Sequence, residues 1–74
     1  MSTDCLVKLL DVVALTFDAT EKGLVCGQVG TVVEMLGPNV FEVEFSGDDG
    51  RAYARGAFGG SELMVLRFEP VIWA

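Results

Sequence analysis

Hydrophobic and polar residues alternate most regularly in the segment VFEVEFS, residues 40–46. The apolar row is Phe41, Val43 and Phe45, and the polar row is Glu42 and Glu44. A period of two places these rows on opposite faces of a strand. The pattern therefore predicts an antiparallel sheet with one buried and one solvated face.

Turn residues divide the rest of the chain into further short apolar segments. Gly-Pro-Asn and Asp-Asp-Gly are typical of tight turns, and Pro70 ends regular pairing because it has no backbone N–H. The predicted strands are residues 11–17, 28–36, 40–46, 51–58 and 63–68, with a long loop at 18–27 and a loop or single helical turn at 59–62. These elements predict an all-β fold, a small five-stranded SH3-like barrel.

Turn lengths also predict the register of the central strands. A three-residue loop at 37–39 and a four-residue loop at 47–50 keep the apolar faces together. The predicted pairs are Met35 with Phe41, Glu34 with Glu42, Val33 with Val43, Thr31 with Phe45, Glu42 with Arg55 and Glu44 with Tyr53. We therefore expect an outward row of Glu34, Glu42 and Arg55, in which the arginine offsets the repulsion between the glutamates.

Length limits the chain to one domain. We interpret residues 1–8 as a short N-terminal leader and residues 9–74 as a single barrel domain. A chain of this size buries only about 60% of its surface, so part of its large apolar content should stay exposed. A homo-oligomer and a stable monomer both fit this expectation, and we favour a homodimer slightly.

An apolar stripe is the predicted contact surface for such an oligomer. Val32, Leu36 and Val40 are expected to point outward from the second and third strands, and Trp73 lies in an apolar tail after the last strand. The tail, the leader around Leu6 or a second subunit could cover the stripe.

Charge bears on the choice of partner. The chain has 5 basic and 11 acidic residues, for a net charge of −6. Few side chains can neutralise phosphates, so we expect no nucleic acid as partner, and a basic protein partner is favoured. No segment approaches the roughly 20 apolar residues of a membrane span, and no signal peptide is visible. A cytoplasmic protein with free thiols at Cys5 and Cys26 is the expectation.

Candidate catalytic chemistry is sparse. Histidine is absent, which removes the commonest general base and the usual catalytic triads. Cys26 is interpreted as a small, buried or half-buried hydrophobe. Asp48 and Asp49 precede a glycine, which is ordinary turn chemistry, and their spacing does not follow a calcium loop. We expect no enzyme activity, no cofactor and no metal.

The loops offer the best candidate binding surface. Its predicted members are Phe17, Asp18, Glu21, Asp48, Asp49 and Tyr53. In a small barrel the first long loop and the turn after the third strand can flank a groove, and this one would be acidic and aromatic. Such a groove suits a basic peptide or protein. The alternative, which the residues themselves favour, is that Phe17 belongs to the core and the acidic residues are solvated turn residues.

Several ordered motifs resemble a known family. They are LLDVVAL at 9–15, EKGL at 21–24, GQVGTVVE at 27–34, FEVEF at 41–45 and the closing residues 66–70. Over residues 8–71 the chain resembles an uncharacterised bacterial family, domain of unknown function 4926. The resemblance implies an SH3-like barrel without a known activity. The gene neighbourhoods of the family imply an accessory or antitoxin-like role.

A second, shorter resemblance concerns residues 27–33. They are similar to the Gly-x-x-Gly-x-Val core of the KOW motif of ribosomal and transcription-elongation proteins. A tight turn entering a curved strand explains the same glycines, and only Lys22 supplies a nearby positive charge. A non-enzymatic protein-interaction module is therefore the first hypothesis for function. A homo-oligomeric structural barrel with a ligand pocket at the subunit junction is the alternative, and a KOW-like nucleic-acid module is a remote one.

Overall fold

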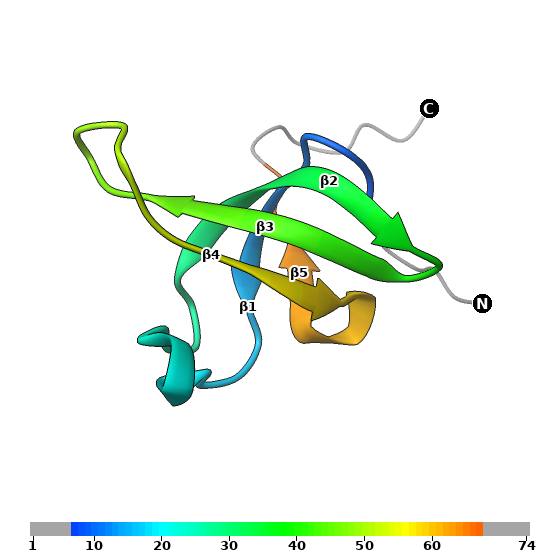
Figure 1. Cartoon of the computed structure of the whole chain (residues 1–74), viewed down its shortest axis with the longest axis horizontal. Helices are drawn as coiled ribbons and strands as arrows, with labels where there is room; N and C mark the ends of the chain where they lie inside the picture. Colours follow the sequence, from blue (N-terminus) through cyan, green and yellow to red (C-terminus); the bar gives the residue numbers. More distant parts are fainter. Residues whose placement is uncertain (1–6, 68–74) are drawn as a thin grey trace, which may run out of the picture.

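The computed structural model describes residues 7–67, which form five strands and two short 3-10 turns (Figure 1). The elements are β1 (Val12–Leu15), η1 (Thr20–Lys22), β2 (Val29–Gly37), β3 (Val40–Ser46), β4 (Ala52–Gly59), η2 (Gly60–Glu62) and β5 (Leu63–Val65). No α-helix occurs between residues 7 and 67. The predicted all-β fold of five strands is confirmed. Trp73 and most of the predicted leader lie outside the described residues.

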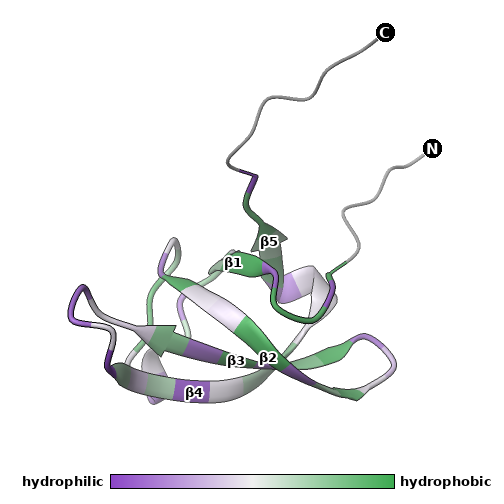
Figure 2. Ribbon diagram, turned by 90° about the horizontal axis from the view of Figure 1, so that it is seen from above, coloured by the Kyte–Doolittle hydropathy of each residue, from purple (hydrophilic) through white to green (hydrophobic). Residues whose placement is uncertain are grey.

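The strands form one antiparallel sheet in the order β4-β3-β2-β1-β5. The sheet is strongly twisted, and Figure 2 shows β1 and β5 on one side of the layer that contains β3 and β4. η2 joins β4 directly to β5, the two strands at opposite ends of the sheet order. This arrangement is consistent with a small barrel-like fold and encloses a single core.

The core lies on the concave side of the sheet and is entirely apolar among the described residues. Its buried members are Val13, Leu15, Ala19, Leu24, Val32, Phe41, Val43, Phe45, Phe58 and Leu63. The predicted inward row of β3 is confirmed, because Phe41, Val43 and Phe45 are buried, while Glu42 and Glu44 are half-buried on the other face. Burial of these side chains supplies most of the driving force for folding.

A β-bulge at Val33 changes the expected register between β2 and β3. On the hairpin side of the bulge, Glu34 pairs with Glu42 and Met35 with Phe41, as predicted, but Gly37 pairs with Val40 across a two-residue loop instead of the expected three-residue loop. Beyond the bulge, Val43 pairs with Val32 instead of Val33, and Thr31 pairs with Glu44 instead of Phe45.

The bulge also corrects the predicted apolar stripe. One extra residue in a strand reverses which side chains face the core. Val32 therefore points inward and is 0% exposed, whereas Leu36 and Val40 are exposed, as expected. Met35, expected inside, is 55% exposed because the β2–β3 hairpin extends beyond the core.

The register between β3 and β4 differs from the prediction by two residues. Ser46 pairs with Ala52 across a five-residue loop rather than a four-residue one, and a bulge follows between Phe45 and Ser46. Each feature adds one residue, so Glu44 faces Arg55 and Glu42 faces Ala57. The predicted pairs of Glu42 with Arg55 and of Glu44 with Tyr53 are therefore wrong.

Candidate functional site

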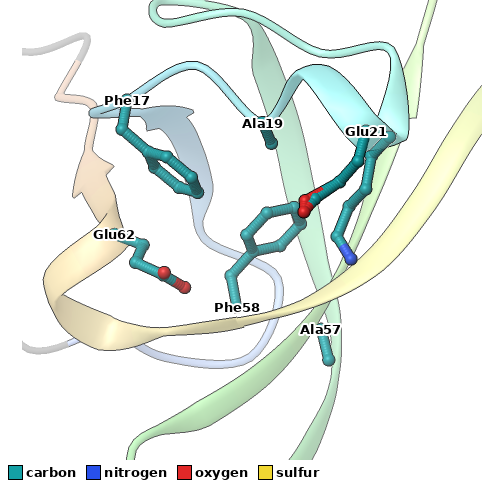
Figure 3. Close-up of a pocket in the computed structure, with 7 residues that line it drawn as sticks. Phe17, Ala19, Glu21, Ala57, Phe58 and Glu62 are labelled. Carbon is teal, nitrogen blue, oxygen red and sulfur yellow. The ribbon is translucent and has the colours of Figure 1, made fainter.

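A shallow cavity of about 230 Å³ lies between the β1–β2 loop and the end of β4. Its lining residues are Phe17, Ala19, Glu21, Lys22, Ala57, Phe58 and Glu62 (Figure 3). We call this cavity the η1–η2 pocket, because η1 and η2 form two of its walls. Residues more than 30 positions apart in the sequence meet here.

The β1–β2 loop is held firmly in place beside η2. The backbone N–H of Thr16 donates a hydrogen bond to the carbonyl oxygen of Glu62, at 3.1 Å. Ala19 and Leu24 form an isolated β-bridge and are both buried. Gly23 ends η1 with a positive φ of 74°, a conformation that favours glycine. These contacts fix the pocket wall that carries Phe17 and Glu21.

Two aromatic rings form the apolar part of the pocket. Phe58 is buried, and its ring packs edge-on against Phe45, with centroids 5.9 Å apart. Phe17 contacts Phe58 in a second T-shaped pair at 6.5 Å and is 37% exposed. Phe58 therefore forms a rigid floor, and Phe17 forms a partly solvated side wall.

Carboxylates enter the pocket from both 3-10 turns. Figure 3 shows Glu21 beside the Phe58 ring and Glu62 extending from η2 toward the base of the Phe58 side chain. One oxygen of Glu62, Oε1, accepts a hydrogen bond from the backbone N–H of Gly59 at 2.9 Å. This bond fixes the direction of the Glu62 side chain and leaves its second oxygen available.

A positive charge of the protein also lies over the ring. The Nζ atom of Lys22 is 5.7 Å from the centroid of Phe58, within the range of a cation–π contact. The stem of Lys22 passes close to Gly56, where an added Cβ would lie 3.4 Å from its Cδ atom. The small residue in β4 thus gives the lysine stem room to reach the pocket.

The lining chemistry favours noncovalent binding of a cation. It combines aromatic faces with carboxylates and contains no thiol, hydroxyl or imidazole. Aromatic rings attract cations through their quadrupole, and nearby carboxylates add direct Coulomb attraction. Among residues 7–67, no group of three or more Cys, Asp and Glu side chains is arranged to hold a metal ion.

The structure separates the predicted binding residues into different places. Phe17 and Glu21 line the η1–η2 pocket. Asp18 is adjacent in sequence, but its Oδ1 accepts the backbone N–H of Cys26 at 2.8 Å and braces the loop.

The other three predicted residues do not line the pocket. Asp48 and Asp49 lie in the β3–β4 turn, where Oδ1 of Asp49 accepts the backbone N–H of Arg51 at 3.0 Å. The hydroxyl of Tyr53 accepts a hydrogen bond from Nε2 of Gln28 at 3.0 Å.

The sequence analysis did not identify five residues that line the pocket: Ala19, Lys22, Ala57, Phe58 and Glu62. The sequence feature that could have indicated them is the short connection at 59–62, because it has to place the end of the fourth strand next to the start of the fifth. The sequence pattern did not show that this connection faces the first loop.

Cys26 is exposed, which corrects its interpretation as a buried or half-buried hydrophobe. The carboxylate of Asp18 accepts a hydrogen bond from the backbone N–H of Cys26, and the following Gly27 has a φ of 92°. The thiol therefore lies on the outside of the loop. Cys5 lies outside the described residues.

The glycines of the KOW-like segment have structural explanations. Gly27 occupies the left-handed backbone region, which favours glycine. Gly30 packs so closely on β3 that an added Cβ would lie 2.8 Å from the carbonyl oxygen of Glu44.

Between residues 7 and 67, no helix is long and apolar enough to cross a membrane.

Comparisons with known proteins identify a family for this chain. Neither the curated proteins nor the solved structures gave a significant match. A family model does match, and it covers residues 9–65, most of the chain and both walls of the η1–η2 pocket. The chain belongs to the family described as a domain of unknown function (DUF4926).

Proposed function

We propose that this protein is a non-enzymatic interaction module that binds a basic segment of a partner protein at the η1–η2 pocket. The observation that carries the proposal is the ring of Phe58, which shares the pocket with the carboxylates of Glu21 and Glu62 and is covered by the cation of Lys22. A surface that attracts its own lysine has the electrostatics to attract a positive side chain of another molecule.

Pocket size and overall charge support the same proposal. The volume of about 230 Å³ is below the range of about 300–1,000 Å³ that is usual for small-molecule sites. The pocket therefore suits one side chain of a larger partner. The net charge of −6 would steer a basic partner toward the protein and raise its association rate.

The biological setting of the proposal rests on fold and family. We assign the curved five-stranded sheet to the SH3-like barrels on the basis of its strand order and the 3-10 turn between β4 and β5. The family resemblance suggests an accessory or antitoxin-like protein of the bacterial cytoplasm. Its partner would then be encoded by a neighbouring gene.

A matched pair of variants tests the proposal. Products of adjacent genes are co-expressed with the full chain, and any complex is then measured by calorimetry with purified components. Glu21→Gln/Glu62→Gln removes both pocket carboxylates but keeps the Oε1 acceptor for Gly59. Asp48→Asn/Asp49→Asn changes the net charge equally in the β3–β4 turn, which lies outside the pocket.

We expect the pocket variant to weaken binding by at least about tenfold, because both carboxylates would become buried against the positive charge of the partner, and loss of such a pair raises the dissociation rate. The turn variant should bind within about twofold of the wild type, as rim charges contribute little. A partner that binds both variants equally well would exclude the pocket as its site.

Homo-oligomerisation is a second candidate, supported by one exposed surface. Leu36 and Val40 are 47% and 38% exposed and lie close to Met35 on the β2–β3 hairpin. An oligomer formed through this hairpin could enclose a ligand site at the subunit junction. Light scattering over a range of protein concentrations measures the mass directly, and a monomer at every concentration would eliminate this candidate.

A further inference from the structure

Lys22 places a cation of the protein itself in the η1–η2 pocket. Its Nζ atom lies over the ring of Phe58 at 5.7 Å, and its stem rests against Gly56. The lysine therefore occupies the place where a positively charged side chain of a partner would bind.

We infer that the η1–η2 pocket recognises an arginine side chain of the partner, and that Lys22 is an internal competitor which this guanidinium displaces. The inference rests on the proposed function and names the chemical group that the site binds. It also assigns to Lys22 the role of a competitor that lowers the affinity of the pocket for any incoming cation by the same factor.

The contacts of Lys22 are weak enough for displacement. Among residues 7–67, the ion pairs within 4.0 Å are Arg51 with Asp49 and Arg55 with Glu42, so neither pocket carboxylate is paired with Lys22. An exposed cation–π contact contributes only about 0.5–1 kcal/mol. The side chain is exposed and can swing into solvent without opening the core.

The geometry favours arginine over lysine as the displacing group. A guanidinium is flat, stacks on aromatic faces and is more weakly hydrated than an ammonium. It can also donate parallel hydrogen bonds to a carboxylate. In the pocket, the carboxylate of Glu21 can accept such a parallel pair, and the second oxygen of Glu62 can accept one further hydrogen bond. A lysine would repeat the contact that Lys22 already makes and gain less.

A titration monitored by NMR tests the choice of group on the wild-type chain. The probes are three acetylated, amidated tripeptides, Gly-Arg-Gly, Gly-Lys-Gly and Gly-citrulline-Gly, in which citrulline keeps the shape of arginine but is neutral. We expect the arginine peptide to shift the resonances of Lys22, Phe58 and Glu62. The lysine peptide should bind at least about threefold more weakly, and the citrulline peptide should cause no shift.

A pair of lysine variants tests the competition. Lys22→Gln removes the internal cation, and Lys8→Gln makes the same change of net charge at an exposed site that does not line the pocket. Lys22→Gln should tighten binding of the arginine peptide by about two- to fivefold relative to Lys8→Gln, the equivalent of one exposed cation–π contact.

The outcomes separate this inference from the proposed function. Equal affinities of the two lysine variants would overturn the role of Lys22. Equal binding of the arginine and citrulline peptides, or no shift at the pocket with any peptide, would overturn arginine recognition. The proposed function would survive each of these results if Glu21→Gln/Glu62→Gln still lowered the affinity for the protein partner. It would be overturned together with the inference if that variant left the affinity unchanged.

Discussion

The guanidinium of Arg55 donates from Nε to Oε2 of Glu42 at 2.9 Å, although the β-ladder pairs Arg55 with Glu44. The ion pair runs diagonally across the solvated face of β3 and β4. On the other side, Glu42 pairs with Glu34 of β2. Arg55 therefore places a positive charge beside Glu42 and Glu44 of β3, on the face where Glu42 also neighbours Glu34 of β2.

Replacement of Arg55 by glutamine should destabilise the protein by about 0.5–1 kcal/mol, because the ion pair is lost and the glutamates repel one another. Salt screens both effects, so the difference from the wild type should shrink at high ionic strength. Urea unfolding at low and high salt measures this. Arg51→Gln is the control, since its contact with Asp49 is 4.0 Å long and highly exposed. A salt-independent loss in Arg55→Gln would contradict the electrostatic explanation.

Gly30 is the position in β2 where a side chain should be least tolerated. An added Cβ would lie 2.8 Å from the carbonyl oxygen of Glu44 and 2.9 Å from the ring of Phe45. The carbonyl belongs to the neighbouring strand and cannot move without parting the sheet. Gly30→Ala should therefore cost about 1–3 kcal/mol of stability by overpacking.

Gly37→Ala is the matched control for Gly30→Ala. It lies at the end of the same strand, and an added Cβ there meets no atom within 4 Å. Its stability should stay within about 0.5 kcal/mol of the wild type. Chemical denaturation of both variants gives the comparison, and similar losses would show that the close contact at Gly30 is not the cause.

Phe17 and Phe58 touch each other but should differ in their importance for folding. Phe58 is buried in the core, so Phe58→Ala should cost about 3–5 kcal/mol. Phe17 is 37% exposed, so its truncation loses a smaller buried apolar area and one edge contact, and should cost about 1.5–3 kcal/mol. Thermal unfolding distinguishes the two. If Phe17→Ala were as costly as Phe58→Ala, Phe17 would be a core residue rather than a pocket wall.

The strands could be predicted because their side chains alternate clearly. In β3, aromatic residues and glutamates differ so much in hydration that only one arrangement of faces is stable. The turn after β3 was less predictable, since the glycines and aspartates at 47–50 fit loops of several lengths. The structure uses five loop residues and a bulge.

The candidate site could be predicted only in part. Phe17 and Glu21 stood out because an aromatic and an acid in a polar loop are visible in the sequence. Asp18 and Asp49 have the same visible chemistry, but the backbone uses their carboxylates as hydrogen-bond acceptors. Phe58 looked like an ordinary strand residue, because its role depends on a loop about 40 residues earlier.

The bulge at Val33 overturns the predicted outward position of Val32, and a pair of identical substitutions tests the burial of Val32. Val32 and Val33 are adjacent, apolar and β-branched, so either can face the core. The structure buries Val32 completely and leaves Val40 exposed. Val32→Thr should therefore cost about 1–3 kcal/mol, because it places a hydroxyl in an apolar core. Val40→Thr should change stability by less than about 0.5 kcal/mol. Urea denaturation compares the two, and a cost at Val40 equal to that at Val32 would mean that the β2–β3 hairpin is covered in solution.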